Sequence, residues 1–255
     1  MGTPPFVWAA SIPIVFAFHH IPCIWHTRAY ASTFGLATFG RCLGACKPPS
    51  GKKGVHRKLI SVVDYFDNMA PVWDTKIKID YSLIKKVIGK TDKNLFSTIL
   101  DIGCGTGNLF PMLLARLKED GLLYGLDPSR QMLKRASSKF TDPRIRLIEA
   151  FSENIPLQDE TIELITVFSC FPHLRDKKVC LREWFRVLVP KGIALIFHTQ
   201  GRENINNIHR TLPAPINDHI LEPASFVAKE ALEKGFSVLE TRDDENLYLV
   251  LLQKP

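Results

Sequence analysis

The first 63 residues of the chain contain no aspartate and no glutamate. This stretch holds seven of the 33 Lys and Arg residues, so the rest of the chain carries 26 basic and 26 acidic residues and is neutral. The formal net charge of +7 therefore belongs to the N-terminal stretch. A nucleic-acid-binding domain normally shows a basic excess on its folded part. We therefore expect no nucleic acid among the partners of the neutral part.

Cysteines are few and follow no paired framework. They are Cys23, Cys42, Cys46, Cys104, Cys170 and Cys180. Such scattered cysteines are typical of a reducing compartment, so we expect the main body of the chain to be cytoplasmic. Only Cys42 and Cys46 are close together, and no second ligand pair follows them at zinc spacing. We therefore expect no metal site.

Residues 6–25 carry no charged side chain, and this length equals that of a membrane span, although prolines and histidines interrupt it. The start, MGTPP, lacks the positive charge of a secretory signal, and Phe6 stands where myristoylation requires Ser or Thr. Three interpretations of residues 1–54 remain open: an organellar transit sequence, a weak membrane anchor through residues 6–25, or an upstream extension outside the working protein. A Pro/Gly/Lys-rich linker, Lys47–Gly54, separates this segment from a globular domain over 55–255.

The globular part alternates apolar strand-like runs with amphipathic helical segments, which predicts an α/β fold. Strands are expected at 97–102, 122–126, 146–150, 162–168, 187–198, 236–240 and 247–252, and helices at 61–70, 81–88, 108–117, from 129, at 179–188 and at 223–234. The last two strands flank a polar turn and read as a hairpin.

The stretch ILDIGCGTGN, residues 99–108, is a predicted strand that runs into a glycine turn and a helix start. Glycines let the backbone approach a ligand closely, and a helix start offers free N–H groups. The dinucleotide pattern GxGxxG requires glycine where Asn108 stands, which argues against NAD. Asp101 would repel a pyrophosphate but pair with an ammonium group. S-adenosylmethionine has an adenosine, an ammonium group and no phosphate.

This DxGxGxG pattern resembles motif I of the class I S-adenosylmethionine-dependent methyltransferases, in their small-molecule, methyltransferase-11-like branch. The resemblance implies a Rossmann-like seven-stranded sheet with an antiparallel last strand and helices on both faces. It assigns cofactor contacts to Asp101, Gly103, Cys104, Gly105 and Gly107.

Two further segments are similar to cofactor motifs of this family. GLDPS, residues 125–129, resembles motif II, which implies that Asp127 accepts hydrogen bonds from both ribose hydroxyls and that Pro128 lies beside it. Asp127 as a cap of the following helix is the alternative, and both roles can hold together. The segment from Phe151 resembles the adenine-binding run, with Phe151 where the family commonly has Asp. Ser152, backbone groups or the face of the Phe151 ring must then contact the adenine.

The residues after the fourth strand face the methyl group in this family, which implies a role for Ser169, whereas Cys170 is expected to be a small buried side chain. The acceptor pocket is expected between this loop, the FDxxAxxWD-like segment with Phe66 and Trp73, and the insert 201–221. An ordinary packing helix is the alternative for the FDxxAxxWD-like segment. Further pocket residues are predicted to be His198, Arg202 and Arg210, and the candidate bases are His209 and His173.

The sequence thus predicts an S-adenosylmethionine-dependent methyltransferase with a small-molecule acceptor. The two arginines would suit an acidic acceptor, because guanidinium groups bind carboxylates bidentately. An RNA or protein methyltransferase and a non-catalytic cofactor-binding regulatory protein of the same fold are the alternatives.

Overall fold

The computed structural model describes residues 61–77, 79–91 and 95–255. The three interpretations of residues 1–54, including the anchor at 6–25, fall outside the described residues. Among the helices of the described ranges, none combines the length and the apolar character that crossing a membrane requires.

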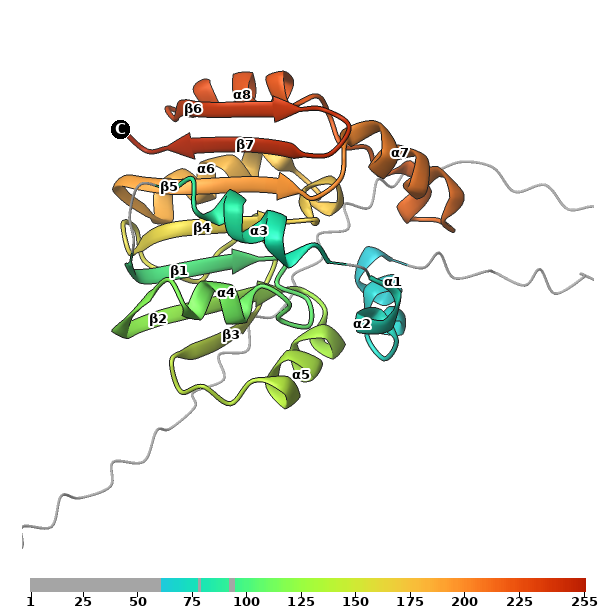
Figure 1. Ribbon diagram of the computed structural model, residues 1–255, viewed down its shortest axis with the longest axis horizontal. Coiled ribbons are helices and arrows are strands. Elements are labelled where there is room, and N and C mark those ends of the chain that lie inside the picture. The colour runs from blue at the N-terminus through green and yellow to red at the C-terminus, as the bar shows by residue number, and fades with distance from the viewer. Residues whose placement is uncertain (1–60, 78, 92–94) are drawn as a thin grey trace, which may run out of the picture. The chain divides into compact units, whose positions relative to one another are not determined.

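Seven strands form one sheet in the described part of the chain, in the order β3-β2-β1-β4-β5-β7-β6 (Figure 1). The first five run parallel, and β7 pairs antiparallel with both β5 and β6. This confirms the predicted Rossmann-like sheet with an antiparallel last strand. The strands are β1 Phe96–Ile102, β2 Leu117–Asp127, β3 Ile145–Glu149, β4 Ile162–Phe168, β5 Leu188–His198, β6 Ser237–Asp243 and β7 Tyr248–Gln253.

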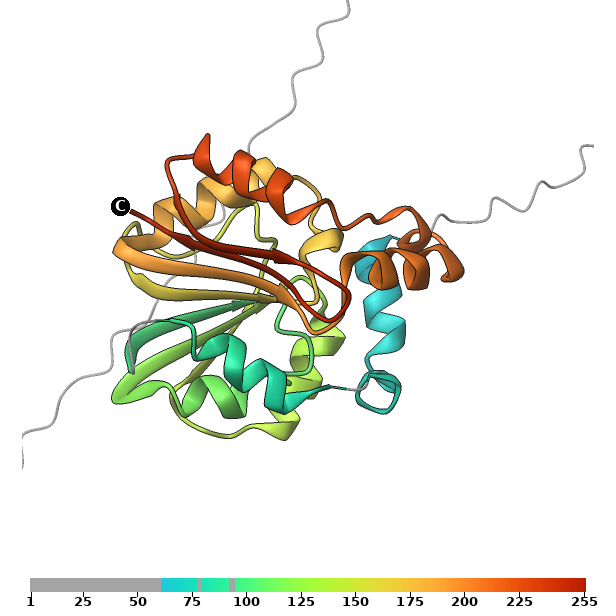
Figure 2. The same ribbon diagram turned by 45° about the horizontal axis from the view of Figure 1, so that its top comes forward.

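Helices cover both faces of the sheet, which explains why its central strands read as continuous apolar runs. On one face lie α3 Tyr81–Ile88, α4 Phe110–Leu114 and α5 Arg130–Lys139, and on the other α6 Lys177–Val187 and α8 Ala224–Leu232 (Figure 2). Neighbouring residues of β1 point to opposite cores: Ile99 packs with the first group and Leu100 with the second, and both are fully buried.

The remaining helices lie at the end of the sheet where β1, β4 and β5 finish (Figure 1). They are α1 Val62–Met69, α2 Trp73–Lys76 and α7 Arg202–Thr211, together with the short 3-10 helices Phe171–His173 and Ile216–Asp218. The predicted break at Pro71 separates α1 from α2. Ligands of open α/β sheets bind at this carboxyl end.

The helix predicted at 108–117 is shorter than expected. It covers only Phe110–Leu114, because the chain then turns back into the sheet. Leu117 pairs with Phe96 of β1, and the N–H of Phe96 donates to the carbonyl of Arg116 at 2.8 Å. The apolar character of Leu117 therefore reflects its place in the sheet and not on a helix face.

Candidate active site

The glycine loop follows β1 directly and takes backbone conformations that favour glycine. Gly103, Gly105 and Gly107 have φ values of 64°, 54° and 80°. A Cβ on Gly107 would strike the ring of Phe110 at 2.7 Å, whereas a Cβ on Gly105 would meet only Trp73, at 3.8 Å. Gly107 is therefore required for packing and does not line the cavity described below, contrary to prediction.

Several N–H groups of this loop donate to acceptors within the protein. Those of Gly103 and Cys104 donate to the carbonyl of Leu126, and that of Gly107 donates to the carbonyl of Cys104. These three N–H groups are therefore not free for a ligand, and α4 begins only at Phe110. What the loop offers a ligand is close backbone approach and the carboxylates beside it.

Asp101 lies within β1 and is 2% exposed. Its Oδ1 accepts a hydrogen bond from the hydroxyl of Thr166 on β4 at 2.7 Å. Burial raises the pKa of this carboxyl to about 7, with a further contribution from the charge of Asp127. A cationic ligand group would hold Asp101 in its ionised form.

Asp127 ends β2, the neighbour of β1, and is 8% exposed. Its two oxygens accept the N–H groups of Gly105, at 2.9 Å, and of Ser129, at 2.8 Å. Burial raises its pKa to about 6 against the effect of these hydrogen bonds. The side chain that caps α5 is Ser129, which accepts from Met132 N, while Asp127 accepts the N–H of Ser129 itself just before the helix.

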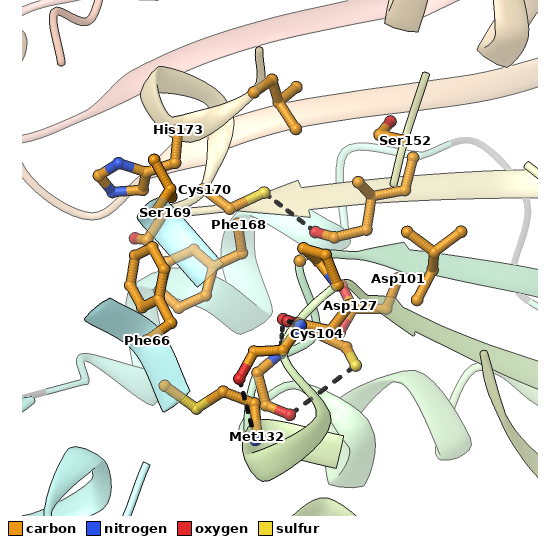
Figure 3. Close-up of a pocket in the computed structure, with 18 of the residues that line it drawn as sticks. Phe66, Asp101, Cys104, Asp127, Met132, Ser152, Phe168, Ser169, Cys170 and His173 are labelled. Atoms are coloured by element: carbon orange, nitrogen blue, oxygen red, sulfur yellow. Dashed lines mark hydrogen bonds between the residues drawn. The ribbon is translucent and has the colours of Figure 1, made fainter. Parts of the chain in front are cut away.

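A cavity with about 1100 Å³ of empty space, counting its open mouth, lies at this end of the sheet. Asp101, Cys104 and Asp127 lie on one side, and Phe66, Phe168 and His173 lie on the other (Figure 3). The predicted cofactor residues that line it are Asp101, Gly103, Cys104, Gly105, Asp127, Pro128, Phe151, Ser152 and Ser169.

Helices α1 and α2 form the apolar wall of the cavity. Phe66 and Trp73 line it as predicted, with their ring centroids 5.5 Å apart, and Val62, Ile77 and Ile79 extend the same surface. The packing alternative for this segment therefore does not describe its whole role.

Two carboxylates hold α1 and α2 on the loops of the sheet. Asp67 accepts from the hydroxyl of Ser129 at 2.6 Å, and Asp74 accepts from the hydroxyl of Thr106 at 2.5 Å and pairs with Lys139 at 2.9 Å. These contacts fix the apolar wall beside the glycine loop.

The segment after β3 contains Ser152 and Phe151, the two side chains that were expected to contact the adenine. The hydroxyl of Ser152 accepts from Trp184 Nε1 at 2.8 Å and is buried, so its oxygen is already engaged. The guanidinium of Arg175 lies 3.5 Å from the centre of the Phe151 ring. Phe151 therefore presents an aromatic surface at the cavity, with a cation held against the ring.

The loop after β4 brings two predicted residues to the cavity. Ser169, with a φ of 54°, and Cys170 both line it. The thiol of Cys170 donates to the carbonyl of Ile102 at 3.1 Å, and burial raises its pKa well above the ordinary value. Cys170 is thus a neutral thiol. The expectation of a buried side chain is wrong, because Cys170 is only half-buried and faces the cavity.

Three of the predicted acceptor residues do not line the cavity. His198 is 1% exposed, both its ring nitrogens lack a partner within the described residues, and burial lowers its pKa to about 3. Arg202 pairs with Asp243 at 3.0 Å and with Glu203 at 2.8 Å. Arg210 is exposed and donates to Asn207. The arginines therefore provide no support for an acidic acceptor.

The two candidate bases have different positions. His173 lines the cavity, whereas His209 does not. The Nδ1 of His209 lies 2.7 Å from the carbonyl oxygen of His219, and the ring centroids of His173 and His209 are 5.0 Å apart. His219 itself, which sequence reasoning did not single out, has its Nδ1 2.7 Å from Nδ1 of His173. The sequence feature that could have identified His219 is its position in the same insert as His209.

Comparison with known proteins agrees with this geometry. The profile of a family described as a methyltransferase domain matches residues 99–192. A ubiquinone/menaquinone biosynthesis C-methyltransferase of Campylobacter jejuni is 28% identical over 161 residues, which cover 58% of this chain and 67% of that protein. A demethylmenaquinone methyltransferase of Lactiplantibacillus plantarum is 32% identical over 145 residues, covering 53% of this chain and 61% of the relative.

Solved structures show the same fold. The crystal structure of a SAM-dependent methyltransferase from Aquifex aeolicus superimposes with a TM-score of 0.59 at 21% identity and covers 74% of this chain and 98% of its own. At this identity the likeness concerns the arrangement of the sheet and its helices.

Proposed function

Because this chain belongs to the class I S-adenosylmethionine-dependent methyltransferases and has a small-molecule acceptor, we propose that the acceptor is an apolar compound with an aromatic hydroxyl group. The observation that carries the proposal is the apolar wall formed by Phe66, Trp73, Ile77 and Ile79. An aromatic ring gains both from burial against such a wall and from edge-to-face contact with its rings.

The residues of the cavity fit S-adenosylmethionine. Gly105 leaves space for a ligand, the buried Asp101 calls for an ammonium group, and each oxygen of Asp127 keeps a lone pair for a ribose hydroxyl. Phe151 offers its ring to the adenine. When bound, S-adenosylmethionine supplies an electrophilic methyl group, so that alignment of the acceptor and exclusion of water contribute most of the catalysis.

A hydroxyl acceptor must lose a proton, and His173 is the cavity residue suited to receive it. Burial lowers its pKa well below the ordinary value, so the imidazole is neutral and holds a lone pair. The cavity thiols Cys104 and Cys170 have raised pKa values and hold their protons. We therefore assign His173 as the general base, and His173→Ala should lower turnover by about 10² to 10⁴.

The test is methyl transfer by the purified full chain to a panel of acceptors, measured as release of S-adenosylhomocysteine. Alkylated hydroquinones and catechols should be methylated. The matched controls are alkylbenzenes without hydroxyl groups, aliphatic carboxylates and transfer RNA, and these should not react. Methylation of the carboxylates or RNA in preference to the phenols would overturn the proposed acceptor class.

For the cellular location we propose the cytoplasm, with an organellar or membrane-associated location through residues 1–54 as the alternative. The free thiols of Cys104, Cys170 and Cys180 support a reducing compartment. Imaging of the full chain with a C-terminal fluorescent protein decides between the two.

A further inference from the structure

Three histidines from two separate segments of the chain meet beside the cavity. His173 follows β4, His209 lies on α7, and His219 lies in the segment after Ile216–Asp218. The ring centroid of His173 is 5.0 Å from that of His209 and 5.0 Å from that of His219. In the described ranges no group of three or more His, Cys, Asp or Glu side chains could hold a metal ion. The interaction between these rings is therefore one of hydrogen bonding.

The central contact is the 2.7 Å between Nδ1 of His173 and Nδ1 of His219. Two neutral imidazoles can share one proton at this distance, so one ring donates and the other accepts. Burial lowers the pKa of both rings, which favours their neutral forms. If His173 donates, its proton is on Nδ1 and its Nε2 carries the lone pair that a base requires.

The segment that carries His219 is held in place by two buried polar side chains of α7. The Nδ1 of His209 lies 2.7 Å from the carbonyl oxygen of His219 and must donate to it. Asn206 donates to the carbonyl of Leu221 at 3.1 Å and accepts its N–H at 2.8 Å. Asn206 and His209 are three residues apart, so they lie on the same side of α7. This side of the helix fixes the backbone on both flanks of Ile220.

We propose that His219 is a positioning residue for the base His173, and that His209 and Asn206 hold it there. His219 accepts the Nδ1–H of His173, which leaves the lone pair on Nε2 available to accept a proton. This inference rests on the proposed function, because it assumes that the acceptor must lose a proton. It assigns a role to the insert, whose arginines do not reach the cavity.

The step moves one proton and one methyl group. The acceptor hydroxyl gives its proton to Nε2 of His173, and the oxygen forms its bond to the methyl carbon as the carbon–sulfur bond breaks and the sulfur keeps the electron pair. The charge on the resulting imidazolium is shared across the hydrogen bond to Nδ1 of His219. After the product leaves, Nε2 returns its proton to water, and the pair is neutral again.

Other titratable groups lie near the pair. Lys177 forms an ion pair with Glu222 at 2.8 Å and lowers the pKa of both histidines, while Asp218 raises that of His219. His198 lies near enough to lower the pKa of His173 as well. None of these groups is altered in the variants below, so any change in the titration of His173 reports on its partner.

The first experiment needs no acceptor. The full chain is labelled with ¹⁵N-histidine, saturated with S-adenosylhomocysteine and studied by long-range ¹H–¹⁵N correlation spectroscopy. The expected tautomers are Nδ1–H for His173, Nε2–H for His219 and Nδ1–H for His209. An Nε2–H tautomer of His173 at neutral pH would overturn the proposal, because Nε2 would then hold a proton and not accept one.

The second experiment compares two variants, using the acceptor identified by the panel above. His219→Phe keeps a ring of similar size but removes the acceptor, and His219→Asn keeps an acceptor near the position of Nδ1. We expect His219→Phe to lower kcat by 30-fold or more and to move the acid limb of its pH profile to lower pH. His219→Asn should remain within fivefold of the original protein. Affinity for S-adenosylhomocysteine should be unchanged in both.

A purely structural role for His219 would lower both variants alike and leave the acid limb in place, and this result would refute the positioning role. If the unaltered chain methylates no phenol, the proposed acceptor class fails, while the tautomers still decide the positioning of His173. The two failures are therefore distinguishable.

Discussion

The backbone N–H of Gly105 donates to Oδ2 of Asp127 at 2.9 Å, so the loop after β1 is bound to the end of the neighbouring strand β2. The other oxygen, Oδ1, accepts from Ser129 at the start of α5. One carboxylate thus sets the relative position of the glycine loop and the second motif. A ligand that spans the two strands meets a surface that is organised before it binds.

Replacement of this carboxylate should weaken cofactor binding. Asp127→Ala is expected to reduce the affinity for S-adenosylhomocysteine by about 1.5 to 3 kcal/mol, the range for hydrogen bonds to a charged group. Isothermal titration calorimetry measures the change, with Asp120→Ala, at an exposed position of the same strand, as control. An affinity equal to that of the unaltered protein would remove Asp127 from the ribose site.

Binding of the cofactor should release a proton near neutral pH. The pKa of Asp101 is raised to about 7 in the protein, and an ammonium group beside it favours the ionised form. Affinity should therefore rise as the pH increases from 5.5 to 7.5. Calorimetry at pH 6.5 in buffers of different ionisation enthalpy counts the released protons, and Asp101→Asn should abolish the release. A pH-independent affinity would contradict this role.

The same carboxyl predicts a trend in stability without cofactor. An unfolded Asp titrates near 3.9, so between that pH and about 7 the folded state binds more protons than the unfolded state. The contribution of Asp101 to the free energy of unfolding should therefore fall as the pH rises through this window. Urea denaturation at several pH values tests this, and Asp101→Asn should be less sensitive to pH. A variant with the same slope as the unaltered chain would exclude Asp101 as the source.

Gly105→Ala should impair both folding and binding. Its φ of 54° costs an L-residue roughly 1–2 kcal/mol, and the added methyl group would occupy the cavity. The matched control is Gly89→Ala, where φ is −64° at the end of α3. Urea denaturation should show a loss for Gly105→Ala only, together with loss of S-adenosylhomocysteine binding. Retained binding would show that the loop approaches the ligand less closely than we infer.

Ser152 should prove more important for stability than for adenine binding. Ser152→Ala leaves the buried N–H of Trp184 without its acceptor, which costs about 1–3 kcal/mol. Ser138→Ala, on the exposed surface of α5, should be nearly neutral. The comparison is made by urea denaturation and calorimetry on the same samples. A large loss of affinity at unchanged stability would instead return Ser152 to the adenine site.

Residues 1–53 should be dispensable for cofactor binding. Every residue that lines the described cavity lies between Val62 and Arg175. A chain that begins at Gly54 is therefore expected to fold and to bind S-adenosylhomocysteine with the affinity of the full chain. Insolubility or a weaker affinity in the truncated protein would give the N-terminal segment a structural role.

The sequence alone determined the positions of the glycine loop and of the acidic residue that ends β2, because local backbone patterns set these positions. The glycine loop after β1 and the acidic residue that ends β2 were recognisable, and parallel pairing of these strands then places Asp101 and Asp127 at one edge. The helices and strands of the chain were also predicted nearly to their ends. The exceptions are the end of α4 and the start of β2, which lies at Leu117 and not at residue 122. Leu117 pairs with Phe96 in the sheet, which periodicity cannot distinguish from helix packing.

Only the tertiary structure decided which side chains are free to act. Ser152 is engaged by Trp184, Arg202 by Asp243, and His173 by His219, and each partner lies more than 30 residues away in the chain. Local sequence fixes where a polar side chain sits along an element, but its hydrogen-bond partner depends on how distant elements pack. For that reason the sequence placed Phe66, Trp73 and His173 at the cavity but could not show that His198, Arg202, Arg210 and His209 lie away from it.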